Sequence, residues 1–68
     1  MWHSLKCAVR RGDFRGVVIK NKTVYARYQD QEPSVLGTSR EQRKVQEFVE
    51  SRGYPVDVVG AETGYASE

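Results

Sequence analysis

The sequence predicts an α+β fold in which a three- to four-stranded antiparallel sheet packs against one C-terminal α-helix. Two observations lead to this prediction. The first half of the 68-residue chain contains short runs in which apolar and polar residues alternate or β-branched residues gather, a pattern that is typical of strands. The second half contains one amphipathic segment with apolar residues at helical spacing and with signals for both of its ends.

The first predicted strand covers residues 4–10. Leu5, Cys7 and Val9 alternate there with Lys6, Ala8 and Arg10, and a period of two places alternate side chains on the same face of a sheet. Cys7 would then lie on the apolar face as a buried, unreactive thiol.

A hairpin is expected next. Residues 15–20 are rich in β-branched side chains, residues 23–28 continue the pattern, and Asn21 and Lys22 lie between them. Asn tolerates the positive φ that a two-residue type I′ turn requires. Residues 34–36 are expected to return briefly to the sheet after a polar turn.

The helix is predicted over residues 39–52. Thr38 or Ser39 can cap its N-terminus, Gly53 suits the left-handed position after its end, and Pro55 prevents continuation. Its apolar stripe consists of Val45, Phe48 and Val49.

The remaining segments complete the expected organisation. Residues 56–59 are expected either to add an edge strand or to pack as an extended segment. Residues 1–59 then form a single small domain, and residues 60–68, with Tyr65 as their one large apolar side chain, are expected to be a flexible tail.

Composition excludes several classes of function. One cysteine and one histidine, Cys7 and His3, are too few for an intramolecular disulfide or a metal cluster. No nucleophile, base and carboxylate occur at a catalytic spacing, so we expect a protein that is not an enzyme and that has no cofactor. No apolar run approaches the roughly 18 residues of a membrane span, and we expect a soluble, cytoplasmic protein with no membrane partner.

Charge is divided unevenly along the chain. Residues 1–28 carry seven Lys or Arg against one acid, whereas the remaining 40 residues carry four bases against eight acids. Clustered cations on one surface are typical of proteins that bind polyanions.

The expected hairpin register gathers much of this charge on one sheet face. Val17, Ile19, Val24 and Ala26 would form the core face. The opposite face would carry Lys6, Arg10, Lys20 and Arg27, together with Phe14, Val18, Thr23, Tyr25 and Gln29, and no acid. Arg15 would lie at its boundary. The candidate residues for binding nucleic acid or a partner are therefore Lys6, Arg10, Arg15, Lys20, Tyr25 and Arg27.

Three motifs in order resemble those of a DNA-binding family. They are Phe-Arg-Gly-Val at residues 14–17, Tyr-Ala-Arg-Tyr-Gln-Asp at 25–30 and Val-Leu-Gly-Thr at 35–38, and a capped helix follows. Over residues 14–50 this order resembles the plant GCC-box-binding domain, whose fold the arm-binding domains of tyrosine recombinases share.

This resemblance implies a three-stranded sheet with one helix, whose exposed face enters the DNA major groove. In that family the strand arginines contact bases and phosphates; here Arg15 matches the motif arginine, Lys20 keeps the charge of another contact position, and Arg27 and Gln29 occupy outward positions on the third strand. Val18 and Val35 stand where the family has an arginine and a tryptophan.

Three interpretations follow from these patterns. The first is a small module that binds nucleic acid, with double-stranded DNA as the preferred ligand. The second is a protein-interaction or inhibitor module, of the kind that phages and mobile elements encode, which covers an acidic surface of a larger protein. The third is a double-stranded-RNA domain, although that family's lysine cluster at the final helix is replaced here by Arg40 and Glu41.

Overall fold

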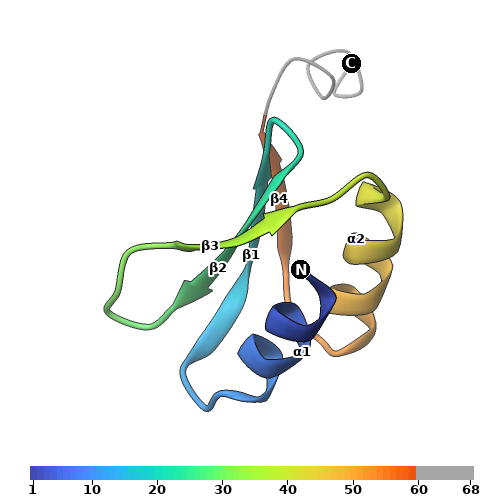
Figure 1. Cartoon of the computed structure of the whole chain (residues 1–68). Coiled ribbons are helices and arrows are strands. Elements are labelled where there is room, and N and C mark those ends of the chain that lie inside the picture. Colours follow the sequence, from blue (N-terminus) through green and yellow to red (C-terminus); the bar gives the residue numbers. More distant parts are fainter. Residues whose placement is uncertain (60–68) are drawn as a thin grey trace.

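The computed structural model describes residues 1–59 and confirms the α+β class (Figure 1). A four-stranded sheet and two helices make up this part of the chain. The predicted tail, residues 60–68, lies outside the described residues. The elements follow the order α1 (Trp2–Arg10), β1 (Phe14–Lys20), β2 (Thr23–Tyr28), β3 (Ser34–Thr38), α2 (Gln42–Ser51) and β4 (Val56–Val59).

The sheet is mixed rather than wholly antiparallel. Its strand order is β3-β2-β1-β4, and β4 pairs with β1 in parallel while the other two pairs are antiparallel. A parallel neighbour requires a crossover connection, and α2 provides it between β3 and β4. Residues 56–59, for which two arrangements remained open, are therefore an edge strand.

Both helices pack on the same face of the sheet, and one core joins them to it (Figure 1). Every large side chain at the centre of this core is apolar and less than 2% exposed, so its burial is a main source of folding free energy. These side chains are Leu5, Phe14, Val17, Ile19, Val24, Val45 and Val49.

The predicted strand over residues 4–10 is wrong, because this segment is helix α1. Leu5 and Ala8 are buried against the sheet, whereas Cys7, which the alternating pattern placed beside Leu5, is exposed. Leu5 belongs both to the strand pattern of Leu5, Cys7 and Val9 and to the helical pattern of Leu5 and Ala8. A segment this short therefore fits the period of a strand and the period of a helix. Helix formation places Leu5 and Ala8 on one stripe.

The hairpin between β1 and β2 is confirmed. Asn21 and Lys22 have φ values of 50° and 64°, as a type I′ turn requires. The register pairs Lys20 with Thr23 and Val18 with Tyr25, as the sequence predicts.

The register changes at the start of β1. An irregularity between Phe14 and Gly16 pairs Phe14 with Tyr28 instead of Gln29. Arg15 is the extra residue of this bulge. Phe14 therefore faces the core, where its ring packs edge-on against Tyr28 and Tyr54, and its predicted place on the opposite face is wrong.

The predicted C-terminal helix exists but is shorter than expected. It begins at Gln42 and its N-cap is Glu41, so the predicted cap at Thr38 or Ser39 is wrong. In the preceding turn the Ser39 hydroxyl accepts a hydrogen bond from the Glu41 amide. Gly53 has a φ of 89° after the helix end, as predicted. Neither α1 nor α2 has the length and apolar character of a membrane-spanning helix.

Candidate nucleic-acid interface

The six candidate residues lie on two different sides of the sheet. Lys6 and Arg10 belong to α1 and therefore to the helical side. Lys20, Tyr25 and Arg27 lie on the sheet face that the helices leave uncovered. The predicted single basic face is wrong in this respect, because it depended on residues 4–10 being a strand.

The sixth candidate residue, Arg15, lies in the bulge at the start of β1. Its guanidinium donates hydrogen bonds to the Gln29 side chain and to the Phe14 carbonyl. These bonds hold it near the hairpin end and away from the other five residues.

A groove between α1 and α2 gathers cations on the helical side. Its volume is about 250 Å³. Lys6 and Arg10 line one wall, Arg52 lines the other, and no acidic residue is among those that form it. The lining consists of His3, Lys6, Cys7, Val9, Arg10, Phe48 and Arg52.

Core packing positions the two walls of the groove. Leu5 and Ala8 anchor α1 on the sheet, which turns Lys6 and Arg10 away from the core. Trp2 packs edge-on against Phe48 of α2, with ring centroids 5.7 Å apart. This contact between the two helices holds Lys6 and Arg10 on one side of the groove and Arg52 on the other.

Arg52 is a cation that the sequence analysis did not select. It follows Phe48, which packs against Trp2 of α1, by four positions, and this helical spacing places both residues on the same side. Its guanidinium carbon lies 5.1 Å from the Phe48 ring centroid, a distance that permits a cation–π contact. The spacing of Arg52 from the apolar residues of the predicted helix could therefore have indicated its place beside α1.

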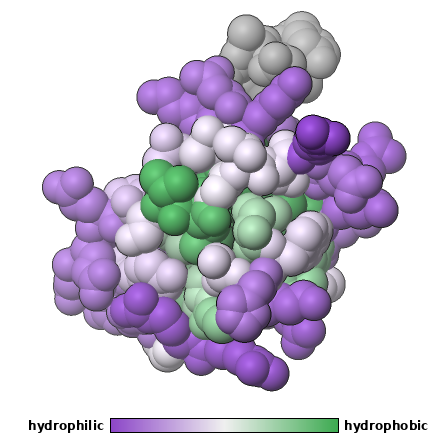
Figure 2. Space-filling view, in the orientation of Figure 1, coloured by the Kyte–Doolittle hydropathy of each residue, from purple (hydrophilic) through white to green (hydrophobic). Residues whose placement is uncertain are grey.

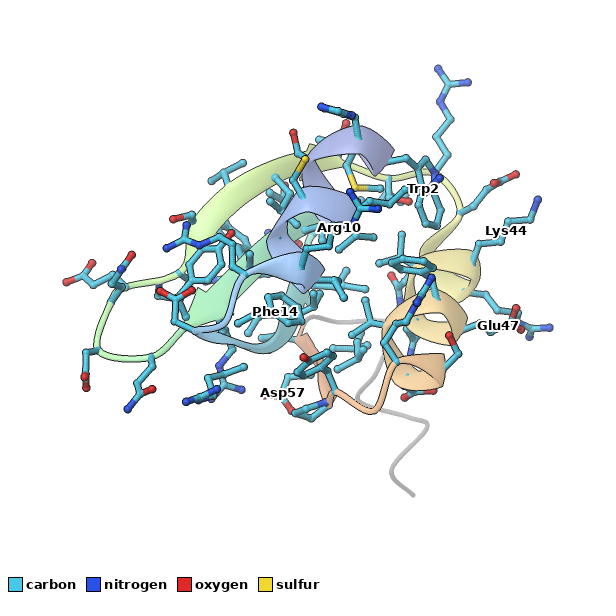
Figure 3. The ribbon with its side chains drawn as sticks, turned by 90° about the horizontal axis from the view of Figure 1, so that it is seen from below. Trp2, Arg10, Phe14, Lys44, Glu47 and Asp57 are labelled. Atoms are coloured by element: carbon cyan, nitrogen blue, oxygen red, sulfur yellow. The ribbon has the colours of Figure 1, made fainter. Side chains whose placement is uncertain are left out.

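Glu47 of α2 points away from the groove. Figure 3 shows Arg10 on the side of α1 that faces α2, whereas Lys44 and Glu47 project from the far side of α2. Lys44 forms an ion pair with Glu41, with Nζ 3.4 Å from Oε1. The groove consequently keeps its positive charge.

Cys7 lies in this groove and is exposed, so the prediction of a buried thiol is wrong. Its sulfur lies 3.8 Å from Nε2 of His3, one helical turn earlier. This contact is a local pair on the helix surface. Among residues 1–59, no cluster of three or more His, Cys, Asp or Glu side chains could hold a metal ion.

We call the uncovered side of the sheet the open face, and it contains Val18, Lys20, Thr23, Tyr25, Arg27, Val35, Asp57 and Val59. β4 brings an acid into it, although none was expected there. Asp57 accepts a hydrogen bond from Arg27, with Nη1 3.0 Å from Oδ2. Arg27 is therefore partly neutralised, and Lys20 is the open-face cation with no ion pair within the described residues.

Another basic residue of the N-terminal half is also paired. Arg11 forms an ion pair with Asp13, with Nη2 2.9 Å from Oδ2, and its guanidinium lies 4.0 Å from the Tyr28 ring centroid. The hydrogen bond to Asp13 raises the pKa of Arg11 above its ordinary value. Arg11 is therefore charged, but its guanidinium is bound to Asp13 at the turn before β1.

Among the described residues, the groove gathers three cations without a lining acid, whereas two other basic residues are paired with acids. Lys6, Arg10 and Arg52 share the groove, whereas Arg11 and Arg27 each have an acidic partner.

Comparison of the chain with protein-family models, with curated proteins and with solved structures found no match.

Proposed function

We propose that this protein is a small module that binds double-stranded DNA through the phosphate backbone, with the groove between α1 and α2 as its contact surface. One observation carries the proposal. Lys6 and Arg10 of α1 and Arg52, which directly follows α2, line the same groove, and no acid lies among the lining residues. Concentrated positive charge without local acids attracts a polyanion.

The spacing of these cations suits a phosphate backbone. Lys6 and Arg10 are four residues apart on α1, which corresponds to about 6 Å along a helix axis. One DNA strand presents a phosphate about every 3.4 Å along the duplex axis. Because the strand winds around the axis, successive phosphates are farther apart in space than this rise, and the two side chains can contact neighbouring phosphates of one strand. Arg52 approaches from the other wall.

The chemistry of the groove supports binding without sequence preference. Cations that neutralise phosphates release condensed counterions, and this release favours binding to any duplex. Base-specific contacts require side chains that enter a DNA groove and match base edges. The proposal assigns only phosphate contacts to Lys6, Arg10 and Arg52.

The resemblance to the GCC-box-binding domain implies a different surface, the open face. On that face Asp57 pairs with Arg27, and Val18 and Val35 occupy the positions of two family contact residues. A carboxylate beside the main cation weakens attraction to phosphate. For this reason the proposal uses the groove.

The alternative is a protein-interaction module, of the phage or mobile-element type, that covers an acidic surface of a larger protein. The same three cations would then contact carboxylates instead of phosphates. For either function we propose a cytoplasmic location. A direct DNA titration separates the two.

The test is a titration of the purified chain with a random-sequence duplex at several salt concentrations. Three phosphate contacts predict a slope of about −2.7 in a plot of log K against log salt. Lys6→Ala, Arg10→Ala and Arg52→Ala are each expected to reduce the magnitude of that slope by about 0.9.

Two variants serve as matched controls. Lys44→Ala removes a cation from the outer side of α2, and Lys20→Ala removes one from the open face; neither should change the slope. If Lys20→Ala flattens the slope while Lys6→Ala does not, the open face binds the DNA. Absence of binding at low salt, with recovery of one nuclease-resistant protein partner, would favour the alternative function.

A further inference from the structure

The open face carries an apolar centre that the described residues leave uncovered. Val18 pairs with Tyr25, and Tyr25 pairs with Val35, so the three side chains lie side by side across β1, β2 and β3. Val35 is 63% exposed. Figure 2 shows hydrophobic surface over β3, bordered by hydrophilic side chains.

A hollow adjoins this centre. It has a volume of about 330 Å³ and is lined by Val18, Lys20, Tyr25 and Pro33. Apolar surface surrounded by polar residues, with a tyrosine near its middle, is typical of protein–protein interfaces.

The strands themselves favour a covered face. β1 contains the continuous apolar run Val17, Val18 and Ile19, and its parallel neighbour β4 ends in Val58 and Val59. Purely parallel sheets are covered on both sides and carry apolar residues on both faces, and the parallel pair β1–β4 of this mixed sheet has apolar residues on both faces as well. Within residues 1–59 the helices cover one of these faces.

The charges of the open face identify the occupant. Arg27 and Asp57 lie together on this face, which also carries Lys20, so an acidic partner would meet Asp57 and a basic partner would meet both cations. A second copy of the same chain is complementary, because a two-fold axis brings each Arg27 toward the partner's Asp57. We propose that two copies of this protein associate through their open faces.

The expected dimer is a sandwich of two sheets about 10 Å apart, with the helices of both copies on the outside. Val18, Tyr25 and Val35 would form its centre. Four strands spaced by about 4.8 Å make a face only about 19 Å wide, so the interface belongs to the smallest class and the dimer is weak. Both α1–α2 grooves stay accessible, and the proposal does not depend on DNA binding.

Sedimentation equilibrium of the nuclease-treated full chain tests the association. We expect a monomer–dimer equilibrium with a dissociation constant between about 10 μM and 1 mM. Val35→Lys places a charge at the centre of the face and should raise that constant at least about tenfold. Ser4→Lys adds the same charge to the exposed side of α1 and should leave the constant unchanged.

Charge reversal gives a second, independent measurement. Arg27→Asp places acids at both positions of the Arg27–Asp57 pair, and Asp57→Arg places arginines at both. Two copies of either variant would bring like charges together, so each variant alone should dimerise less than the natural sequence. A mixture of the two should form a heterodimer at least about tenfold tighter than either homodimer. Circular dichroism of each variant checks that the fold is intact.

Three results would overturn the proposal. They are a natural chain that stays monomeric at about 1 mM, a dimer that Val35→Lys does not weaken, and a mixture that associates no better than its components. A monomeric chain whose Val18, Tyr25 and Val35 amide signals shift on addition of duplex would assign the open face to DNA.

Discussion

Arg27 reaches Asp57 across the one position of β1 that has no side chain. Arg27 pairs with Gly16 in the hairpin register, Asp57 lies on the next strand, and Nη1 of Arg27 is 3.0 Å from Oδ2 of Asp57. The parallel strand β4 thus determines the charge of the open face.

We predict that Asp57→Asn changes the free energy of unfolding by less than about 0.5 kcal/mol, because exposed ion pairs contribute little and are screened by salt. Urea unfolding at two salt concentrations measures this. In a duplex titration at low protein concentration, the variant should also give the same slope of log K against log salt as the natural chain. An increase in affinity would indicate that DNA contacts the open face, since the substitution frees Arg27.

Gly16→Ala should destabilise the fold by about 1–3 kcal/mol, because overpacking forces the backbone to move. A Cβ at position 16 would lie 2.8 Å from the Pro55 carbonyl oxygen, which accepts a hydrogen bond from the Val17 amide. The substitution therefore strains the junction of β1 and β4.

The matched control for this substitution is Gly12→Ala. A Cβ there meets no atom within 4 Å, and the expected change is within about 0.5 kcal/mol. Thermal unfolding followed by the fluorescence of Trp2 compares the two variants. Equal stability of both would contradict the close approach of Pro55.

Ala8→Asn and Cys7→Asn test whether residues 2–10 form a helix. Ala8 is 2% exposed, so Asn should cost more than about 2 kcal/mol through overpacking and an unsatisfied amide. Cys7 is exposed, and the same substitution there should cost less than about 1 kcal/mol. Denaturant titration gives both values. A strand over residues 4–10 would produce the opposite order.

Cys7 also provides a chemical probe of the groove. Because its thiol is exposed, a maleimide should label it in the native protein without denaturant. Saturating duplex should slow that labelling at least about fivefold if DNA occupies the groove, since access controls thiol reactivity. Mass spectrometry measures the rate. An unchanged rate with bound duplex would place the DNA elsewhere.

The hairpin could be predicted from the sequence because its determinants are local. Asn21 and Lys22 adopt the positive φ values that a two-residue turn needs, and the alternation of apolar residues sets the register from Lys20 and Thr23 onward. The bulge at Arg15 could not be predicted. It depends on the burial of Phe14 against Tyr28 and Tyr54, which are distant in the sequence.

The candidate site was predicted only in part. Lys6 and Arg10 were selected for their charge, and both line the groove, but the sequence placed them on a sheet. Residues 4–10 fit two periods equally well, and packing of Leu5 and Ala8 against the sheet decides in favour of the helix. Arg52 joins them because α2 lies beside α1.

Turn chemistry and periodicity act between neighbouring residues, so the α+β class, the hairpin with its turn, the third strand and the presence of the C-terminal helix can be predicted from local patterns. Packing between distant segments sets the helical state of residues 2–10, the parallel pairing of β4 and the division of the cations between two sides. Those outcomes depend on which surfaces bury one another, and short apolar patterns do not specify that.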